Sequence, residues 1–334
     1  MMRCGRPSTV LERLVCGATL AAALVACAGP APVRAQQDTA ARLRAGLIVN
    51  PDLGLAYVMT PAGGIAAVEL ASGEIRWTSQ AAAKPLAVVG NRLIAQVEPT
   101  AAANRLEVVA LNAQSGGQAL VRGFTELPVG VRVSIGETLV GTFSAEARTV
   151  GGNVIVDWTF VPGSRQGMHD PADTAIAGRP GQRQAARPIR GALRMNVTSG
   201  ALTRLDTAQV SPPPRPRWVL PQAEKVSRAA PTQFESADGR HILASEAAGD
   251  DRTFEKYRWT IYERGTGNSV GELRTHISFS PFIVRDSLMI FETTPYARGE
   301  SEEPARLRAF SLATGREIWS VEVREVVYRG PFPP

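Results

Sequence analysis

The chain has 334 residues, of which 44% are hydrophobic and 20% are charged, with 31 glycines and 24 prolines. This composition excludes an intrinsically disordered chain, and the glycines lack the Gly-X-Y period of collagen. No apolar run of about 20 residues follows residue 30, which excludes a polytopic helical membrane protein. The formal charge of +6 includes no block of five or six like charges, so we expect no nucleic-acid partner.

Residues 1–35 are predicted to be an export signal or an N-terminal anchor. Three arginines within the first 13 residues form a positive n-region. Residues 14–28 then form an apolar stretch of about 15 residues, which suits a signal peptide and is short for a membrane-spanning helix. We predict a linker over residues 36–44.

Three interpretations of this N-terminus remain open. Residues 24–27 (LVAC) resemble a bacterial lipobox, in which Cys27 is lipidated and becomes the first mature residue. Residues 33–35 (VRA) resemble a signal-peptidase site instead, with cleavage after Ala35. The third interpretation is an uncleaved helix that stays as an anchor. We favour lipidation of Cys27, and because Ala28 rather than Asp follows it, the outer membrane.

All three cysteines, Cys4, Cys16 and Cys27, lie in this N-terminal region. The body of the chain therefore has no disulfide, no thiolate nucleophile and no cysteine metal site. Its stability must come from apolar burial and strand pairing.

A repeated pattern predicts the fold of the body. Residues 67–77 read AVELASGEIRW, and residues 309–319 read AFSLATGREIW. The alternation before the glycine predicts a strand with one buried face, and the glycine predicts a tight turn with positive φ. Weaker copies lie between them, so that the predicted turn glycines are Gly73, Gly116, Gly200, Gly267 and Gly315.

The first and last spacings of these glycines match a four-stranded propeller blade of about 40–50 residues. Upstream of the turns lie hairpins of two further strands, as at residues 86–95 and 282–291. One such unit cannot bury both of its faces alone, and radial stacking of units solves this. We therefore predict an all-β fold, a β-propeller of four-stranded blades over residues 45–327. Five repeats are detected, five to seven blades fit the length, and residues 328–334 form a C-terminal tail.

The unit at residues 56–77, AYVMTPAGGIAAVELASGEIRW, resembles the PQQ-type β-propeller repeat. That superfamily includes quinoprotein alcohol dehydrogenases and the lipoprotein propeller of the β-barrel assembly machinery. The match is strong near both ends of the body and weak from residue 123 to residue 275. The resemblance implies that Trp77 and Trp319 pack between neighbouring blades.

Two segments depart from the repeat. Residues 163–190 are polar and aperiodic, which predicts a long surface insertion. Residues 211–217 (SPPPRPR) cannot form a central strand because proline supplies no N–H. We predict an extended connector there, with a partner-binding polyproline segment as the alternative.

Motifs that carry chemistry are scarce. The histidines, His169, His241 and His276, share no metal-ligand spacing, and the chain has no nucleophile elbow, P-loop or dinucleotide motif. By resemblance, a quinoprotein enzyme would have a vicinal disulfide, a calcium site and usually eight blades. The body has no cysteine and is too short for eight full blades with inserts. We therefore expect no catalytic residue, no cofactor and no metal.

Two functions remain. The first is a non-catalytic exported propeller, anchored to a membrane, that serves as an interaction scaffold or accessory subunit for a membrane protein complex or other periplasmic or outer-membrane proteins. Loops on a rigid propeller suit such binding. The alternative is a propeller that binds a small ligand or cofactor, a degenerate quinoprotein-type enzyme. It predicts convergent polar side chains in the central channel. We favour the first function.

Overall fold

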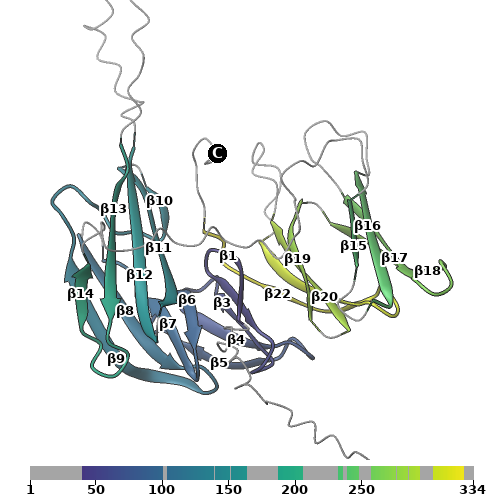
Figure 1. Cartoon of the computed structure of the whole chain (residues 1–334), viewed down its shortest axis with the longest axis horizontal. Helices are drawn as coiled ribbons and strands as arrows, with labels where there is room; N and C mark the ends of the chain where they lie inside the picture. Colours follow the sequence, from purple (N-terminus) through teal and green to yellow (C-terminus); the bar gives the residue numbers. More distant parts are fainter. Residues whose placement is uncertain are drawn as a thin grey trace, which may run out of the picture. The chain divides into compact units, whose positions relative to one another are not determined.

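The computed structural model describes residues 40–100, 104–138, 140–150, 152–163, 187–205, 232–235, 239–247, 257–275, 277–284, 286–293 and 304–326. Their regular structure consists of 22 β-strands in five antiparallel sheets, named A to E in chain order. Within each sheet the strands follow one another as they do in the sequence, as the consecutive arrows of Figure 1 show. Each sheet is thus a meander built from one continuous part of the chain.

The first two sheets contain nine strands. Sheet A is formed by β1 (Ala41–Arg44), β2 (Leu47–Asn50), β3 (Leu55–Met59), β4 (Ile65–Glu69) and β5 (Ile75–Ser79). Sheet B is formed by β6 (Lys84–Val89), β7 (Arg92–Gln96), β8 (Arg105–Asn112) and β9 (Gly116–Glu126).

The other three sheets contain the remaining strands. Sheet C is formed by β10 (Gly136–Thr138), β11 (Gly141–Val150), β12 (Asn153–Pro162), β13 (Ile189–Met195) and β14 (Leu202–Leu205). Sheet D is formed by β15 (Thr232–Glu235), β16 (His241–Ala247), β17 (Tyr257–Glu263) and β18 (Ser269–Thr275). Sheet E is formed by β19 (Ile277–Val284), β20 (Ser287–Thr293), β21 (Arg306–Ser311) and β22 (Glu317–Glu322).

Each predicted turn glycine lies at the turn between the last two strands of its sheet, Gly116 as the first residue of β9, and each has the positive φ that favours glycine. The φ angle is +75° at Gly73 and +64° at Gly315. The amide of Gly73 donates to the carbonyl of Glu69, and the amide of Gly315 donates to the carbonyl of Ser311, each at 2.8 Å. The turn therefore closes on itself, and a residue with a Cβ would be strained at its glycine.

Four apolar clusters join the sheets in pairs. They join D with E, E with A, A with B and B with C. Examples from each pair are Trp259 with Leu288, Leu307 with Val58, Tyr57 with Val109, and Val108 with Val156. The described sheets thus pack in the order D–E–A–B–C, and the last sheet of the chain packs against the first.

These sheets confirm the predicted all-β fold, a β-propeller of four-stranded blades. Five sheets are described, and sheets A and C each carry a fifth strand at their first edge. In each sheet the last strand lies at the opposite edge. In sheets A and E most residues of this last strand are exposed or partly exposed, whereas β2 and β3 of sheet A are wholly buried. The core therefore lies between the sheets, along their earlier strands.

The predicted boundaries need two corrections. Strand β1 begins at Ala41, inside the predicted linker 36–44, so the first sheet starts earlier than expected. In sheet C, β13 begins at Ile189, so the predicted insertion 163–190 is two residues too long at its end. The rest of that insertion from residue 164 to residue 186, the predicted leader with Cys27, and the predicted tail 328–334 lie outside the described residues.

Candidate functional site

Trp77 and Trp319 each lie on the turn of a neighbouring sheet. The indole N–H of Trp77 donates to the carbonyl of Ala113 at 3.2 Å, and that of Trp319 donates to the carbonyl of Leu70 at 3.0 Å. Each acceptor stands three residues before a turn glycine, Gly116 or Gly73. A Cβ at either glycine would overlap the indole ring. Trp77 therefore holds sheet A against sheet B, and Trp319 holds sheet E against sheet A.

The remaining turn glycines make different contacts. Gly200 of sheet C lies against the backbone of Arg122 in sheet B, and Gly315 of sheet E lies against the backbone of Gly271 in sheet D. At Gly267 of sheet D, a Cβ would meet no described atom within 4 Å. The five predicted positions thus have one structural role in common, the turn, and only two of them receive a tryptophan.

A charged cluster that the sequence did not predict joins sheets A, B and C. It consists of Arg42 on β1, Lys84 on β6 and Glu146 on β11, and we call it the inner-strand cluster. Arg42 Nη1 lies 2.8 Å from the carboxylate of Glu146. Arg42 Nη2 also donates to the carbonyls of Leu86, at 2.8 Å, and Ala147, at 3.0 Å. One guanidinium therefore binds two neighbouring sheets from a third.

Lys84 is the buried cation of this cluster, with 3% of its surface exposed. Its ammonium donates to the carbonyl of Ala145 at 3.1 Å. Burial lowers the pKa of Lys84 to about 8, an effect that the negative charge of Glu146 opposes and the positive charge of Arg42 reinforces. The hollow beside these residues leaves no enclosed room even for a water-sized molecule, so it is not a small-molecule site.

A second group of charges ties the end of the chain to sheets A and B. The amide of Arg324 donates to the carbonyl of Met59 at 2.8 Å, and its guanidinium lies 2.7 Å from the carboxylate of Glu98. Glu325 pairs with Arg44 on β1 at 3.0 Å. Burial raises the pKa of Glu325, and the attraction of Arg44 opposes that rise. The residues after β22 thus extend the packing of sheet E onto sheet A.

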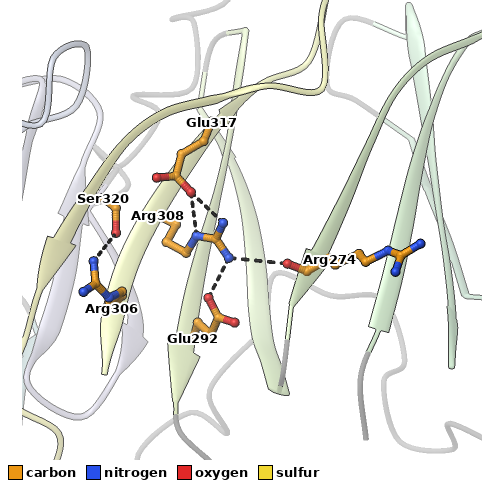
Figure 2. A network of polar contacts seen from close by, with 6 residues as sticks. All are labelled: Arg274, Glu292, Arg306, Arg308, Glu317 and Ser320. Carbon is orange, nitrogen blue, oxygen red and sulfur yellow. Dashed lines mark hydrogen bonds and ion pairs between the residues drawn. The ribbon is translucent and has the colours of Figure 1, made fainter. Parts of the chain in front are cut away.

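Arg308 on β21 is the centre of the network in Figure 2. Its guanidinium bonds to Glu317 at 2.6 Å and to Glu292 at 2.7 Å, and it donates to the carbonyl of Arg274 in sheet D at 3.4 Å. The same guanidinium lies 4.7 Å from the centre of the Phe310 ring. This network links sheets D and E beside their apolar cluster, with one guanidinium between two carboxylates.

Most of the exposed apolar side chains that the structure describes lie on sheets B and C; the side chains of β15 and β19, in sheets D and E, are outside the described set. Among the described residues, eight large apolar side chains are exposed: Ile75, Leu120, Phe124, Val129, Val140, Val150, Val161 and Ile318. Six of these lie on sheets B and C or in the connection between them. Leu120 and Phe124 on the edge strand β9 are 52% and 55% exposed, and the guanidinium of Arg105 stacks 3.5 Å from the Phe124 ring.

Val140 and Val161 form a second exposed apolar pair, on sheet C. Val161 is paired with Thr142 across β11 and β12, and the amide of Gly163 donates to the carbonyl of Val140 at 3.0 Å. The two valines therefore occupy neighbouring positions at the end of the hairpin that leads into the predicted insertion. Isolated apolar residues are ordinary on a surface, but a concentration on one part of it indicates a binding surface.

Other sequence expectations can be located only in part. His241 begins β16 and is partly buried, whereas His169 and His276 lie outside the described residues, as do residues 211–217. In the described part of the chain, no three His, Cys, Asp or Glu side chains gather as a metal site would need. The same part contains no helix long and apolar enough to cross a bilayer.

Comparison with known proteins gives structural neighbours only. No protein-family model matches the chain. No curated protein matches it either. Similar solved structures include the β-propeller domain of the Trilobed protease from Pyrococcus furiosus, which is 13% identical with a TM-score of 0.22, covering 55% of this chain and 43% of that one.

Two further neighbours are enzymes. A quinohemoprotein alcohol dehydrogenase from Pseudomonas putida is 11% identical with a TM-score of 0.23, covering 82% of this chain and 58% of that one. A europium-containing methanol dehydrogenase is 10% identical with a TM-score of 0.28, covering 84% and 71%. The chain thus spans less than two thirds of the protease domain and of the alcohol dehydrogenase. The β-propeller fold rests on the chain's own sheets and turns, and these neighbours carry no activity over to it.

Proposed function

We propose that this chain is a non-catalytic, exported β-propeller that acts as an interaction scaffold or accessory subunit for a membrane protein complex. The observation that carries the proposal is the presence of six exposed large apolar side chains on sheets B and C and the connection between them. Such residues lose water on binding, and each large side chain that becomes fully buried contributes about 1.5–3 kcal/mol. The partner is a protein with an apolar surface, and Leu120 and Phe124 are its main contacts on β9.

The polar residues near the inner strands support the same proposal. A propeller that binds a ligand in its channel needs polar side chains that are free to reach the ligand. In the inner-strand cluster, Arg42 binds two carbonyls and Glu146, and Lys84 binds the carbonyl of Ala145. These groups are used to hold three sheets together. A rigid arrangement of sheets then presents the exposed residues at fixed positions.

The partner surface is tested by paired substitutions. Leu120→Ser with Phe124→Ser is expected to abolish stoichiometric co-purification of the partner from crosslinked native membranes, with thermal unfolding unchanged. The matched control is Ile75→Ser with Ile318→Ser, which removes similarly exposed apolar side chains from sheets A and E, at 50% and 45% exposure. Loss of the partner in the control, or its retention in the first variant, would contradict the assignment to sheets B and C.

The membrane anchor is a separate part of the proposal and rests on the sequence. If Cys27 carries the lipid, Cys27→Ala releases the chain into the soluble fraction. Retention of Cys27→Ala in membranes prepared without the partner would exclude lipidation and leave the uncleaved helix. A bound chromophore in the purified chain would contradict the non-catalytic assignment and revive the quinoprotein alternative.

A further inference from the structure

Strand β9 is the open edge of sheet B. It is the last strand of that sheet and pairs only with β8, so that its other side has no neighbouring strand within the sheet (Figure 1). With 11 residues it is longer than the last strands of the other sheets, which have four to seven. Proteins often protect such an edge by keeping the strand short or by placing a lysine or a proline on it. The sequence of β9, GGQALVRGFTE, has neither of these residues.

The main-chain groups of β9 alternate in direction. The amide of Leu127 donates to the carbonyl of Asn104 at 2.8 Å, and the pairing of β9 with β8 continues from there without a shift back to Val121. In an antiparallel ladder, hydrogen-bonded and non-hydrogen-bonded pairs alternate. Since the pair at Leu127 is hydrogen-bonded, the N–H and C=O groups of Arg122 and Phe124 point away from β8.

Contacts near the end of β9 show the same direction. The carbonyl of Glu126, two residues after Phe124, accepts from the guanidinium of Arg204 in sheet C. Among the described residues, none forms a hydrogen bond with the main chain of Arg122 or Phe124 from this outer side. The turn of sheet C lies on the face of β9 to which Gly123 belongs. The outward groups of two residues are thus available for a further strand.

The residues with these outward groups also carry exposed side chains. Burial alternates along this part of β9, which places Leu120, Arg122 and Phe124 on one face of the strand. The side chain of Arg122 is 52% exposed, as much as those of the two apolar residues. An apolar, a cationic and an apolar side chain therefore follow one another at every second position.

The charges around Arg122 are not balanced. The carboxylate of Glu107 on β8 lies 3.2 Å from the guanidinium of Arg122 and 3.8 Å from that of Arg105. Two positive charges and one negative charge leave a net charge of +1. The next acidic residue on this face of β9, Glu126, is about 13 Å along the strand from Arg122, which is beyond the Debye length. An acidic group is therefore favoured opposite Arg122.

We propose that sheet B binds its partner by strand addition, in which an extended segment of the partner pairs antiparallel with β9. The segment has an acidic side chain opposite Arg122 and apolar side chains two positions to either side, opposite Leu120 and Phe124. Main-chain bonds hold such a segment, and its alternate side chains give the specificity. This inference rests on the proposed function, to which it adds the local structure and the sequence pattern of the partner.

The charge pattern favours a different protein over a second copy of this chain. Antiparallel pairing of two β9 strands in the register that matches their apolar residues places Leu120 opposite Phe124. The same register places the two copies of Arg122 opposite each other. Like charges directly opposite are destabilising, whereas an acidic side chain at this position is favourable.

Binding of a synthetic peptide to the purified full chain tests the pairing. The peptide has the order valine, threonine, glutamate, threonine, valine, with a further threonine at each end. We expect saturable binding, and binding at least about fivefold weaker when lysine replaces the glutamate, because one exposed ion pair is lost. Absence of saturable binding by the glutamate peptide at millimolar concentration would overturn the proposal.

N-methylated peptides test the main-chain bonds separately from the side chains. The amide of the central glutamate faces β9 in the proposed pairing, and its N-methylation should weaken binding about tenfold or more. The amide of the adjacent threonine points away, so its N-methylation is the matched control and should have little effect. Equal binding of the two N-methylated peptides would show that no strand is added.

Substitution of Arg122 tests the register. Arg122→Glu is expected to reverse the preference, so that the lysine peptide binds more tightly than the glutamate peptide. Arg122→Gln, which avoids repulsion from Glu107, should bind the two peptides equally. Retention of the wild-type preference in both variants would contradict the position assigned to the acidic side chain.

The outcomes separate this inference from the proposed function. If Leu120→Ser with Phe124→Ser abolishes co-purification of the native partner while the two N-methylated peptides bind equally, the scaffold function stands and strand addition is wrong. If the peptides behave as expected but the partner still co-purifies with that variant, β9 is a strand-binding edge and its assignment to this partner is wrong. Dimerisation of the wild type that the same variant abolishes would assign the edge to a second copy and overturn the proposal.

Discussion

The E–A and C–D pairs of sheets are put together in opposite ways. Sheets E and A belong to the two ends of the chain, yet they share an apolar cluster and a tryptophan that donates to the neighbouring turn. Sheets C and D follow one another in the sequence, yet none of the apolar clusters of the described residues joins them, and each carries an arginine–carboxylate pair, Arg148 with Asp157 and Arg258 with Glu246. Docking of two sheets therefore does not require that they be neighbours along the chain. At the E–A pair it is supported by Trp319, four positions after its turn glycine, which lies on the turn at Gly73.

The largest loss of stability is expected when the indole of Trp319, which holds sheets E and A together, is removed. Trp319→Ala deletes a buried side chain between sheets E and A and leaves the carbonyl of Leu70 without its donor. We expect a loss of about 3–5 kcal/mol in the free energy of unfolding, measured by urea denaturation. Leu120→Ala, at the equivalent exposed position of sheet B, should change it by less than about 0.5 kcal/mol. Equal effects of the two substitutions would contradict the docking role.

The inner-strand cluster gives a pH-dependent prediction for sheets A, B and C. Burial lowers the pKa of Lys84 to about 8 in the folded chain, against about 10.4 for an unfolded lysine. Between these values the unfolded chain binds more protons, so stability should rise with pH. The rise is at most about 3 kcal/mol, at about 1.4 kcal/mol for each pKa unit. Urea unfolding from pH 7.5 to pH 10 should show it in the wild type.

Lys84→Met is the control for this effect. It removes the titrating group and keeps a flexible apolar side chain of similar length. Its stability should lack the rise between pH 8 and pH 10. A rise of the same size in both chains would assign the titration to another group.

Two glycines that lie against a neighbouring turn should give smaller losses of stability when they are replaced by alanine. Gly123 and Gly271 have ordinary backbone conformations, but a Cβ at either would overlap the backbone of the neighbouring turn. Gly123→Ala and Gly271→Ala should each cost about 1–3 kcal/mol through overpacking between sheets. Gly265→Ala, where the Cβ meets no described atom, should be close to neutral or stabilising. Thermal unfolding of the three variants separates these outcomes.

The smallest effect on stability is expected for an exposed ion pair on sheet D. Arg258 and Glu246 are a pair with side chains 41% and 49% exposed. A double-mutant cycle on this pair should give a coupling energy of at most about 1 kcal/mol, reduced by salt. A coupling energy of several kcal/mol would mean that the pair is buried, which would contradict the exposure of its two side chains.

The sequence was sufficient for the features that are local. The turn glycines, the alternating strands and the four-strand unit follow from residues within one repeat, so the propeller could be predicted. Strand β1 was missed because the four residues ARLR have no strong strand signal of their own. Its arginines are held by Glu146 and by Glu325, far away in the sequence. Such pairing becomes visible only when the sheets are in place.

The docking glycines were missed although a signal existed. A glycine inside a strand often marks the close approach of another backbone, and Gly123 and Gly271 both stand inside the last strand of a sheet. Lys84 was overlooked for another reason. It is one of three lysines in an arginine-rich chain, and nothing in its neighbours KPLAVV indicates that the ammonium is buried.

The bond from the Trp319 indole to Leu70 spans 249 positions of the chain. During synthesis, which begins at the N-terminus, sheet A is complete long before β22 exists. One apolar side of sheet A then stays uncovered until almost the whole chain has emerged, and exposed strands of this kind are prone to aggregate. Contacts between such distant positions also form slowly, because a long loop must be ordered first. Deletion of β22 should therefore leave a fragment that aggregates, because sheet A then keeps its uncovered apolar side.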